Sequence, residues 1–264
     1  MSAAAPPVVN ALRDESVGII ELARPDKFNC LSFAVHEGLG HALTEFERPG
    51  SGVRSILLRA QGKQFCTGAD LEEVRAMRSN PEQLAGFMTL GHAVLRRFEA
   101  STLPVVAACQ GLCLAGGLEL MLACDVVFAA RDARFGDQHA QFGLVPGWGG
   151  SQRLPRLVGL RRALDLFYSA RWIDAETALQ WGLVNHVVAP DALAAEALAY
   201  CKAIGGRSRG GLATMKRLAR VGLEGTLDAG LSIEESQAPG AILSDDVGEG
   251  LEAFIARRKP NFEA

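Results

Sequence analysis

Short apolar runs alternate with longer amphipathic stretches over the first two thirds of the chain. Four runs bounded by turn residues predict strands, at residues 16–22, 55–59, 104–109 and 126–129. Helices are predicted over 32–46 and 116–124, and a third begins at Pro81, where apolar residues recur at spacings of three, four and seven. Strands that alternate with helices in this way predict an α/β fold with crossover connections.

The two ends of the chain lack this alternation. Residues 1 to about 15 are rich in Ala and Pro without periodicity, and they predict a loose leader. After about residue 190 the strand signal disappears, and helical segments broken by glycine pairs remain. We therefore expect a core over residues 1–195 and a helical C-terminal region over residues 196–264.

The chain has 264 residues, of which 48% are hydrophobic and 22% charged, and its net charge is −3. These values are typical of a globular protein and exclude a disordered or collagen-like one. The small negative charge gives no electrostatic basis for binding nucleic acid or an anionic membrane. The longest apolar stretch, 112–124, is shorter than the ~20 residues that span a bilayer. Six cysteines without a C-x-x-C pair, and no signal-peptide pattern, predict a reduced, cytoplasmic protein.

Two common ligand-binding motifs are incomplete in this chain. Glycines at positions 111 and 116 have the spacing of a phosphate-binding loop, but Gly117 and Leu118 stand where Lys and Ser or Thr should follow. His36 and His41 are five residues apart, one too many for the zinc motif H-E-x-x-H. The sequence therefore gives no support for nucleotide or metal chemistry.

One constellation combines a glycine pair with an acid. Gly116 and Gly117 open a helix, where the first backbone N–H groups favour negative charge, as on a carbonyl oxygen that gains electron density. Glu119 follows among apolar side chains, so we expect a desolvated carboxylate with a raised pKa suited to proton transfer. Glu119 could instead only complement the helix dipole, and local chemistry leaves both interpretations open. A second glycine loop at 64–70 is by itself a turn with Asp70 as helix N-cap.

Together these segments resemble the enoyl-CoA hydratase/isomerase (crotonase) superfamily, from about residue 16 to the C-terminus. The matching motifs are R-P-D-K-F-N at 24–29, K-Q-F-C-T-G-A-D at 63–70, Q-G-L-C-L-A-G-G-L-E-L at 110–120, V-P-G-W-G-G-S-Q-R at 145–153, A-L-Q-W-G-L-V at 178–184 and F-I-A-R-R-K-P-N-F at 254–262. Several motifs in the family's order argue against a chance similarity. The resemblance implies a spiral of ββα units, with residues 196–264 as a helical trimerisation region.

The resemblance also implies a substrate and the way it binds. The substrate would be an acyl-CoA thioester, with no separate cofactor, because coenzyme A enters as part of the substrate. The protein would be a homo-oligomer, a trimer or a dimer of trimers, with no nucleic-acid or membrane partner. The backbone N–H groups of Ala69 and Gly116 would form an oxyanion hole around the thioester carbonyl. The other residues expected at the substrate are Lys27, Phe28, Cys30, Gly68, Asp70, Leu71, Phe254 and Lys259, the last two from a neighbouring subunit.

The main departure from the family pattern is a histidine. Glu119 falls on the glutamate that holds and deprotonates water in the family's hydratases, but His139 stands at the position of their second glutamate. A histidine could donate the proton which that glutamate gives, since its reference pKa of about 6.5 keeps both forms accessible. It could instead only line the acyl pocket. Asp137 is not expected to replace the missing acid, because its side chain should point elsewhere.

We therefore expect a lyase that adds water to a 2-enoyl-CoA through an oxyanion-stabilised enolate, with Glu119 as base. The alternatives are a C–C bond hydrolase or an enoyl-CoA isomerase of the same fold that uses His139. Hydrolases of that kind carry an aspartate where this chain has Trp148, which counts against them. A non-catalytic binding protein is less favoured, because Glu119 would then have no role. Apolar side chains within 71–90 suit an acyl pocket or a plain core, so the acyl chain length stays open.

Overall fold

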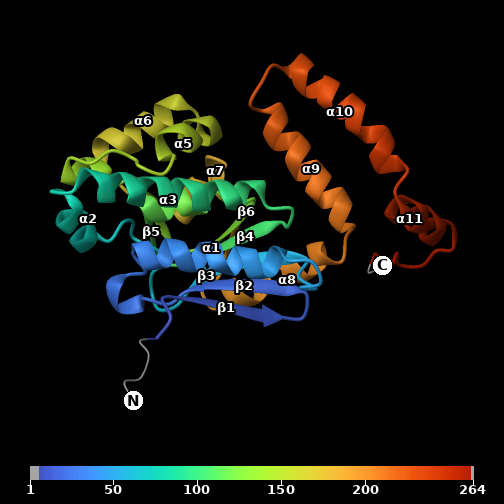
Figure 1. Ribbon diagram of the computed structural model, residues 1–264, viewed down its shortest axis with the longest axis horizontal. Coiled ribbons are helices and arrows are strands. Elements are labelled where there is room, and N and C mark those ends of the chain that lie inside the picture. Colours follow the sequence, from blue (N-terminus) through green and yellow to red (C-terminus); the bar gives the residue numbers. More distant parts are fainter. Residues whose placement is uncertain (1–5, 263–264) are drawn as a thin grey trace.

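The protein is built around a six-stranded sheet in the order β1-β2-β3-β4-β6-β9. A computed structural model describes residues 6–262 (Figure 1). The strands are β1 (Val9–Asp14), β2 (Val17–Leu22), β3 (Ser55–Ala60), β4 (Val105–Cys109), β6 (Val126–Ala130) and β9 (His186–Val188). β1 runs antiparallel to β2, and the other neighbouring pairs are parallel. β2 and β4 are buried along their whole length, as is usual for parallel strands covered on both faces.

A second sheet contains three short strands in the order β5 (Leu112–Leu114), β7 (Arg134–Gly136) and β8 (Ile173–Asp174). β4 and β6 pair in the large sheet, while β5 and β7, which follow them along the chain, pair in the small one. A helix comes after each of these strand pairs, α4 (Gly116–Leu122) after β5 and α5 (Gly150–Val158) after β7. Successive turns of the chain therefore stack on one another, which confirms the expected α/β spiral of ββα units.

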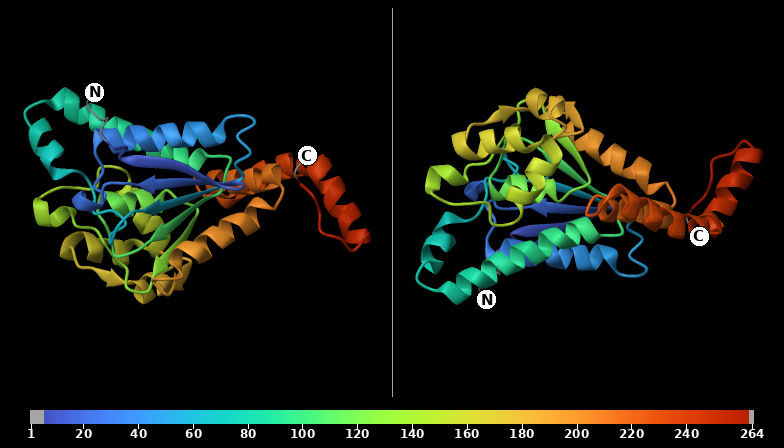
Figure 2. Two further views of the ribbon diagram at one scale, coloured as in Figure 1. Left: turned by 90° about the horizontal axis from the view of Figure 1, so that it is seen from below. Right: turned by 90° about the horizontal axis from the view of Figure 1, so that it is seen from above.

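Helices cover the large sheet. α1 (Phe33–Glu47) and α3 (Pro81–Ala100) lie side by side, and α1 also packs against β1 and β2 (Figure 2). α8 (Leu193–Gly205) packs against β2, β3, β4 and β6. The apolar stripe predicted for α3 faces the core, where Phe87 and Phe98 are fully buried. The remaining helices are α2 (Leu71–Met77), α6 (Leu160–Ser169), α7 (Ala175–Gln180), α9 (Arg209–Gly222), α10 (Leu227–Ile242), α11 (Asp245–Ile255) and the short η1 (Pro25–Lys27) and η2 (His139–Phe142).

The predicted core strands and helices agree with the structure to within two residues, but the prediction of a loose leader is wrong. β1 occupies residues 9–14 of that segment and pairs with β2 along its length, whereas residues 1–5 lie outside the described residues. β1 is a partly exposed edge strand, so hydrogen bonds to β2 define it rather than an apolar pattern. The expected boundary near residue 195 falls inside α8, whose Ala197 and Cys201 are buried in the core.

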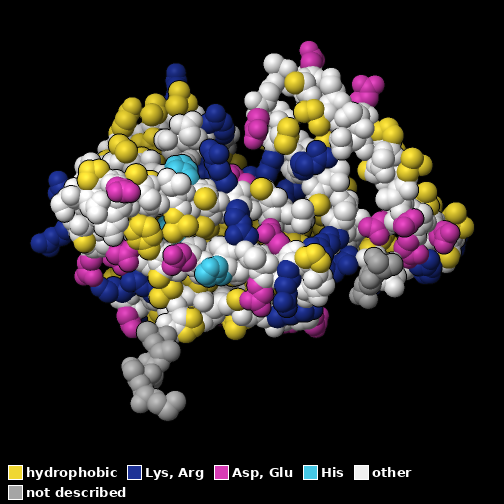
Figure 3. All heavy atoms as spheres, in the orientation of Figure 1, with side chains coloured by type: hydrophobic (Ala, Val, Ile, Leu, Met, Phe, Trp, Pro, Cys, Tyr) yellow, Lys and Arg dark blue, Asp and Glu magenta, His cyan; other side chains and the backbone are white. Residues whose placement is uncertain are grey.

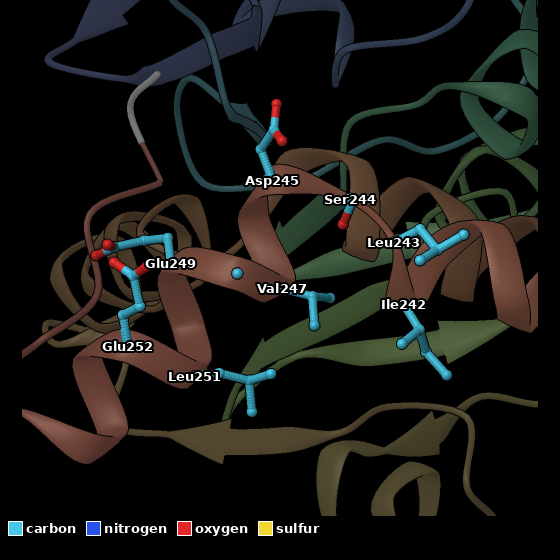
Figure 4. Close-up of a pocket in the computed structure, with 9 residues that line it drawn as sticks. Ile242, Leu243, Ser244, Asp245, Val247, Glu249, Leu251 and Glu252 are labelled. Atoms are coloured by element: carbon cyan, nitrogen blue, oxygen red, sulfur yellow. The ribbon is translucent and has the colours of Figure 1, made fainter.

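Helices α9, α10 and α11 form a C-terminal arm that extends away from the core (Figures 1 and 2). Lys216 and Arg220 of α9 attach it by binding the two carboxylate oxygens of Asp125, at 2.7 and 2.8 Å. Large apolar side chains are exposed along the arm (Figure 3), namely Leu223, Leu227, Leu231, Ile242, Leu243, Leu251, Phe254 and Ile255. Where α10 meets α11, a hollow is lined by Ile242, Leu243, Val247, Leu251, Glu249 and Glu252 (Figure 4). Within residues 6–262, the helices are too short or too polar to cross a membrane.

Candidate active site

Two loops that follow neighbouring parallel strands meet at the candidate site. One loop follows β3, and the other, which carries Gly116, follows β5, the short strand that comes directly after β4. β3 and β4 are parallel neighbours, so the chain leaves both at the same edge of the large sheet. Cys66 N donates to Leu112 O at 3.1 Å, and Leu114 N donates to Cys66 O at 3.0 Å. Gly68, with a φ of +108°, lies so close to the other loop that a Cβ atom there would be 3.2 Å from Gly116 N. The two glycine loops singled out in the sequence are therefore in direct backbone contact.

The backbone N–H groups of Ala69 and Gly116 both remain available as donors. Leu31 and Ala69 form an isolated parallel β-bridge, in which Leu31 N donates to Gly68 O and Asp70 N donates to Leu31 O, both at 2.8 Å. The N–H of Ala69, which lies between these two hydrogen bonds, is not used by the bridge. The N–H of Gly116 is the first of α4 and has no intrahelical acceptor. In the described part of the chain, neither group donates a hydrogen bond. Two free amide donors therefore come from loops that touch each other.

Ala115 turns the chain sharply from β5 into α4. Its φ of 49° and ψ of −118° lie in a region that residues with a Cβ atom rarely adopt. Hydrogen bonds on both sides hold it there, because Ala115 N donates to Gly136 O and Glu119 N donates to Ala115 O, each at 3.0 Å. This strained turn fixes the direction of the following Gly116 N–H.

The carboxylate of Glu119 is almost completely buried, with 1% of the residue exposed. Its Oε1 accepts hydrogen bonds from the backbone N–H groups of Trp148 and Gly150, at 2.8 and 2.7 Å, at the start of α5. Its Oε2 has no hydrogen-bond partner among residues 6–262. Burial raises the pKa of Glu119, and the two amides and nearby His139 only partly oppose this. The expected desolvated acid is confirmed, and the helix end that it stabilises is that of α5.

His139 faces the free oxygen of Glu119. Its Nε2 lies 3.8 Å from Glu119 Oε2, and its Nδ1 lies 2.9 Å from Oδ1 of Asp137. Burial favours the neutral imidazole, but the hydrogen bond to Asp137 and the charges of Asp137 and Glu119 outweigh it, so the pKa of His139 is raised. The structure thus brings the two predicted catalytic side chains together, and it adds a third that was not predicted as their partner.

Asp137 supports the imidazole and does not face Glu119. Its carboxylate is buried, and Oδ1 accepts from the backbone N–H of His139 at 3.2 Å as well as meeting the ring. This agrees with the expectation that Asp137 does not replace the missing glutamate. Its spacing from His139 is that of an Asx turn, the one sequence signal that could have indicated this contact.

The loop before α1 lies beside the Gly68 loop. It carries three of the residues expected at the CoA portion of the substrate, namely Lys27, Phe28 and Cys30. Lys27 Nζ is 2.7 Å from Oε2 of Glu72, and both side chains are exposed. Phe28 is 56% exposed and has a φ of 50°. Burial raises the pKa of the Cys30 thiol to about 11, so it stays protonated at neutral pH. The loop therefore presents one cation and one aromatic ring to solvent.

Asn29 fixes the shape of this loop. Its side-chain Nδ2 donates to Gln61 O at 2.9 Å and to Gln64 O at 2.8 Å, and its Oδ1 accepts from Arg24 N at 2.9 Å. Its φ of 54° is left-handed, a conformation that asparagine tolerates well. The asparagine of the R-P-x-x-x-N motif is therefore explained by hydrogen bonding within the protein.

Asp70 is the N-cap of α2, as predicted. Its Oδ1 accepts from Glu72 N and Glu73 N at 3.1 and 3.4 Å, while Oδ2 pairs with Arg24 at 2.9 Å. Leu71, which follows, is 44% exposed. Asp70 therefore joins the R-P-x-x-x-N loop to the helix that begins beside Ala69.

Phe254 and Lys259 lie far from the other site residues of the same chain. Phe254 belongs to α11, where 81% of it is exposed, and Lys259 follows that helix. α11 and α2, which begins at Leu71, are at opposite ends of the molecule (Figures 1 and 2). A single chain does not bring these two residues to the site.

Comparisons with known proteins agree with this architecture. The family described as enoyl-CoA hydratase/isomerase matches residues 13–264. A probable enoyl-CoA hydratase from Rhizobium meliloti is 36% identical over 247 residues, 94% of each chain. The crotonyl-CoA hydratase of Syntrophomonas wolfei is 36% identical over 257 residues, 95% of each chain. The crystal structure of an enoyl-CoA hydratase from Bacillus anthracis has a TM-score of 0.92 at 34% identity, over 97% of this chain and 99% of that one. The protein therefore belongs to the enoyl-CoA hydratase/isomerase family of enzymes, in the crotonase superfamily.

Proposed function

We propose that this protein adds water across the double bond of a 2-enoyl-CoA thioester. The observation that carries the proposal is the pair of facing groups, Glu119 Oε2 and His139 Nε2, 3.8 Å apart in a buried site. The amides of Ala69 and Gly116 would bind the thioester oxygen, and their hydrogen bonds strengthen as it gains charge in the enolate. Similarity to proteins named enoyl-CoA hydratase and crotonyl-CoA hydratase supports the same reaction.

The two side chains start in complementary protonation states. Because the pKa of His139 is raised, its ring keeps a proton to higher pH than a free imidazole does, and this positive charge favours the ionised form of Glu119. Glu119 is then the base and His139 the acid. Asp137 accepts from Nδ1–H, which directs the other protonated nitrogen of His139 toward Glu119.

The reaction can be followed proton by proton. Glu119 removes a proton from water while the water oxygen bonds to C3, and the electrons of the double bond move through C2 to the thioester oxygen. His139 then gives its proton to C2, which yields a 3-hydroxyacyl-CoA. Glu119 is left protonated and His139 neutral, so one proton passed between them restores both. The short distance between the two groups suits this last step.

Crotonyl-CoA tests the proposal, because hydration removes the absorbance of the conjugated thioester. Glu119→Gln should lower kcat roughly 10²–10⁴-fold, since the amide cannot accept the proton. Asp137→Asn removes the charge that raises the pKa of His139, so the alkaline limb of the kcat profile should move to lower pH. Glu37→Gln, at an exposed position of α1, is the matched control and should change neither kcat nor its pH profile.

Four results would contradict parts of this mechanism. A wild-type protein that leaves crotonyl-CoA unchanged is not a hydratase of this substrate. Formation of a conjugated thioester from a 3-enoyl-CoA without hydration would assign an isomerase, and cleavage of a β-diketone would assign a C–C hydrolase. Full activity in His139→Ala would show that the proton on C2 comes from another donor.

We also propose that the C-terminal arm joins subunits into a trimer or a dimer of trimers. The exposed apolar side chains of the arm support this, because contiguous apolar surface is typical of protein interfaces. Phe254 and Lys259, remote from the site of their own chain, would then reach the CoA of a neighbouring subunit. Light scattering of the purified protein should give a mass of three or six chains, and a monomer would contradict the assembly.

A further inference from the structure

The side chain of Trp148 fills the space between α4 and α3. Its backbone N–H holds Glu119 Oε1 at 2.8 Å, so the indole begins directly beside the candidate base. The ring is edge to face with His36 of α1, at 4.6 Å between ring centroids, and with Phe87 of α3, at 5.2 Å. Only 2% of the residue is exposed. His36 of α1 and Phe87 of α3 therefore hold the ring in one position.

Two glycines make room for this ring. A Cβ atom at Gly116 would lie 2.7 Å from the indole Cζ3, and a Cβ atom at Gly91 of α3 would overlap the indole Nε1. Gly116 carries one of the two amides that we assign to the thioester oxygen. The indole thus reaches from that residue to α3 and occupies the space between them.

The position of the ring bears on the acyl group of the substrate. If the thioester oxygen binds at Gly116, C2 and C3 must lie close to Glu119 and His139. Carbon atoms beyond C3 would then meet the indole on the side of α1 and α3. The ring cannot retreat, because His36 is itself fully buried behind it.

We infer that Trp148 sets the acyl chain length, restricting the enzyme to short acyl groups such as crotonyl and excluding long linear tails. This inference rests on the proposed function. Trp148 then has two separate roles. Its backbone N–H positions Glu119 whatever the side chain is, whereas its indole limits the length of the acyl group. A smaller side chain at this position therefore extends the acyl site and keeps the hydrogen bond to the base.

The test compares kcat/KM for crotonyl-, hexenoyl- and decenoyl-CoA in the wild type, Trp148→Ala and Trp148→Leu. Each additional methylene that a pocket cannot hold lowers kcat/KM by roughly tenfold or more. The wild type should therefore have a kcat/KM for crotonyl-CoA at least about 100-fold above that for decenoyl-CoA. Both variants should shift this ratio toward decenoyl-CoA by at least roughly tenfold. Trp181→Ala is the control, because that ring packs outside the site against Arg162 and Arg171, and it should keep the wild-type ratio.

Binding measurements separate this inference from the hydration reaction. Calorimetry with butyryl-CoA and decanoyl-CoA needs no turnover, and Trp148→Leu should gain affinity for decanoyl-CoA relative to butyryl-CoA even if the protein hydrates nothing. Equal use of crotonyl- and decenoyl-CoA by the wild type would overturn the inference. So would an unchanged chain-length ratio in Trp148→Leu that folds with a wild-type circular dichroism spectrum.

Gly91→Ala gives an independent check of where the ring lies. The added methyl overlaps the indole in the wild type, so it should destabilise the protein, whereas in the Trp148→Ala background it should be tolerated. Equal destabilisation in both backgrounds would show that the ring does not occupy the space against α3.

Discussion

A fall in pH should destabilise the protein through His36, a residue that takes no part in the proposed reaction. His36 is fully buried between Phe87 and Trp148, with ring centroids 5.6 and 4.6 Å away. Neither of its ring nitrogens has a hydrogen-bond partner within residues 6–262. Burial therefore lowers the pKa of His36 from 6.5 to about 4, because no nearby group compensates a charge on the ring.

The size of the effect follows from proton linkage. Between pH 6.5 and about 4 the unfolded chain binds a proton at His36 and the native protein does not, so the free energy of unfolding falls as the pH falls. Since one pKa unit corresponds to about 1.4 kcal/mol, the full loss is about 3 kcal/mol below pH 4. Between pH 7 and pH 5 it amounts to about 2 kcal/mol.

Urea unfolding at a fixed protein concentration, followed by circular dichroism, measures this loss. His36→Leu removes the titrating ring, so its free energy of unfolding should fall by about 2 kcal/mol less than that of the wild type between pH 7 and pH 5. His41→Gln, at an exposed position of the same helix, is the control and should follow the wild type. Parallel pH curves for the wild type and His36→Leu would refute the assignment of a buried, neutral His36.

Two further predictions concern backbone conformation near the site. Ala115→Gly should stabilise the protein by about 1 kcal/mol in thermal unfolding and keep crotonyl-CoA hydration, because glycine adopts the observed φ of 49° without strain; a lower melting temperature would contradict this strain. Asn29→Ala should cost about 2 kcal/mol, because the carbonyls of Gln61 and Gln64 lose their donor. A stability equal to that of the wild type would show that water replaces the amide there.

The core could be predicted from the sequence because its pattern is local. The stripe of α3 and the fully apolar β4 carry their own signal, and Glu119 could be placed in a desolvated first turn from its immediate neighbours. β1 could not be predicted, because pairing with β2 rather than burial forms it. The strands β5, β7 and β8 are only two or three residues long, too short for any periodicity.

Most of the site needed either the family resemblance or the structure. The resemblance placed the amides of Ala69 and Gly116 together, which no local pattern could do, since Ala69 comes after β3 of the large sheet and Gly116 after β5 of the small one. The arrangement of His36 and Trp148 was not predicted at all. In its own segment each is an ordinary core residue. Only the packing of α1 and α3 against the loop before α5 shows that the two rings are in contact and that His36 holds the Trp148 ring in place.

The groups assigned to catalysis share a physical property that stability alone does not explain. Glu119 Oε2 and Asp137 Oδ2 are buried and lack hydrogen-bond partners in the described residues, and Ala115 holds an unfavourable backbone conformation beside them. Each such feature costs about 1–3 kcal/mol, and replacing the acids by apolar residues would remove much of that cost. These costly features lie together in one small region, and the hydrogen-bonded strands of both sheets hold that region in place. Their grouping therefore argues for a role in chemistry. A proton acceptor such as Glu119 has to keep a free lone pair, and an oxyanion hole has to keep free donors, so the unpartnered oxygen of Glu119 and the free amides beside Ala115 are groups that the proposed hydration requires.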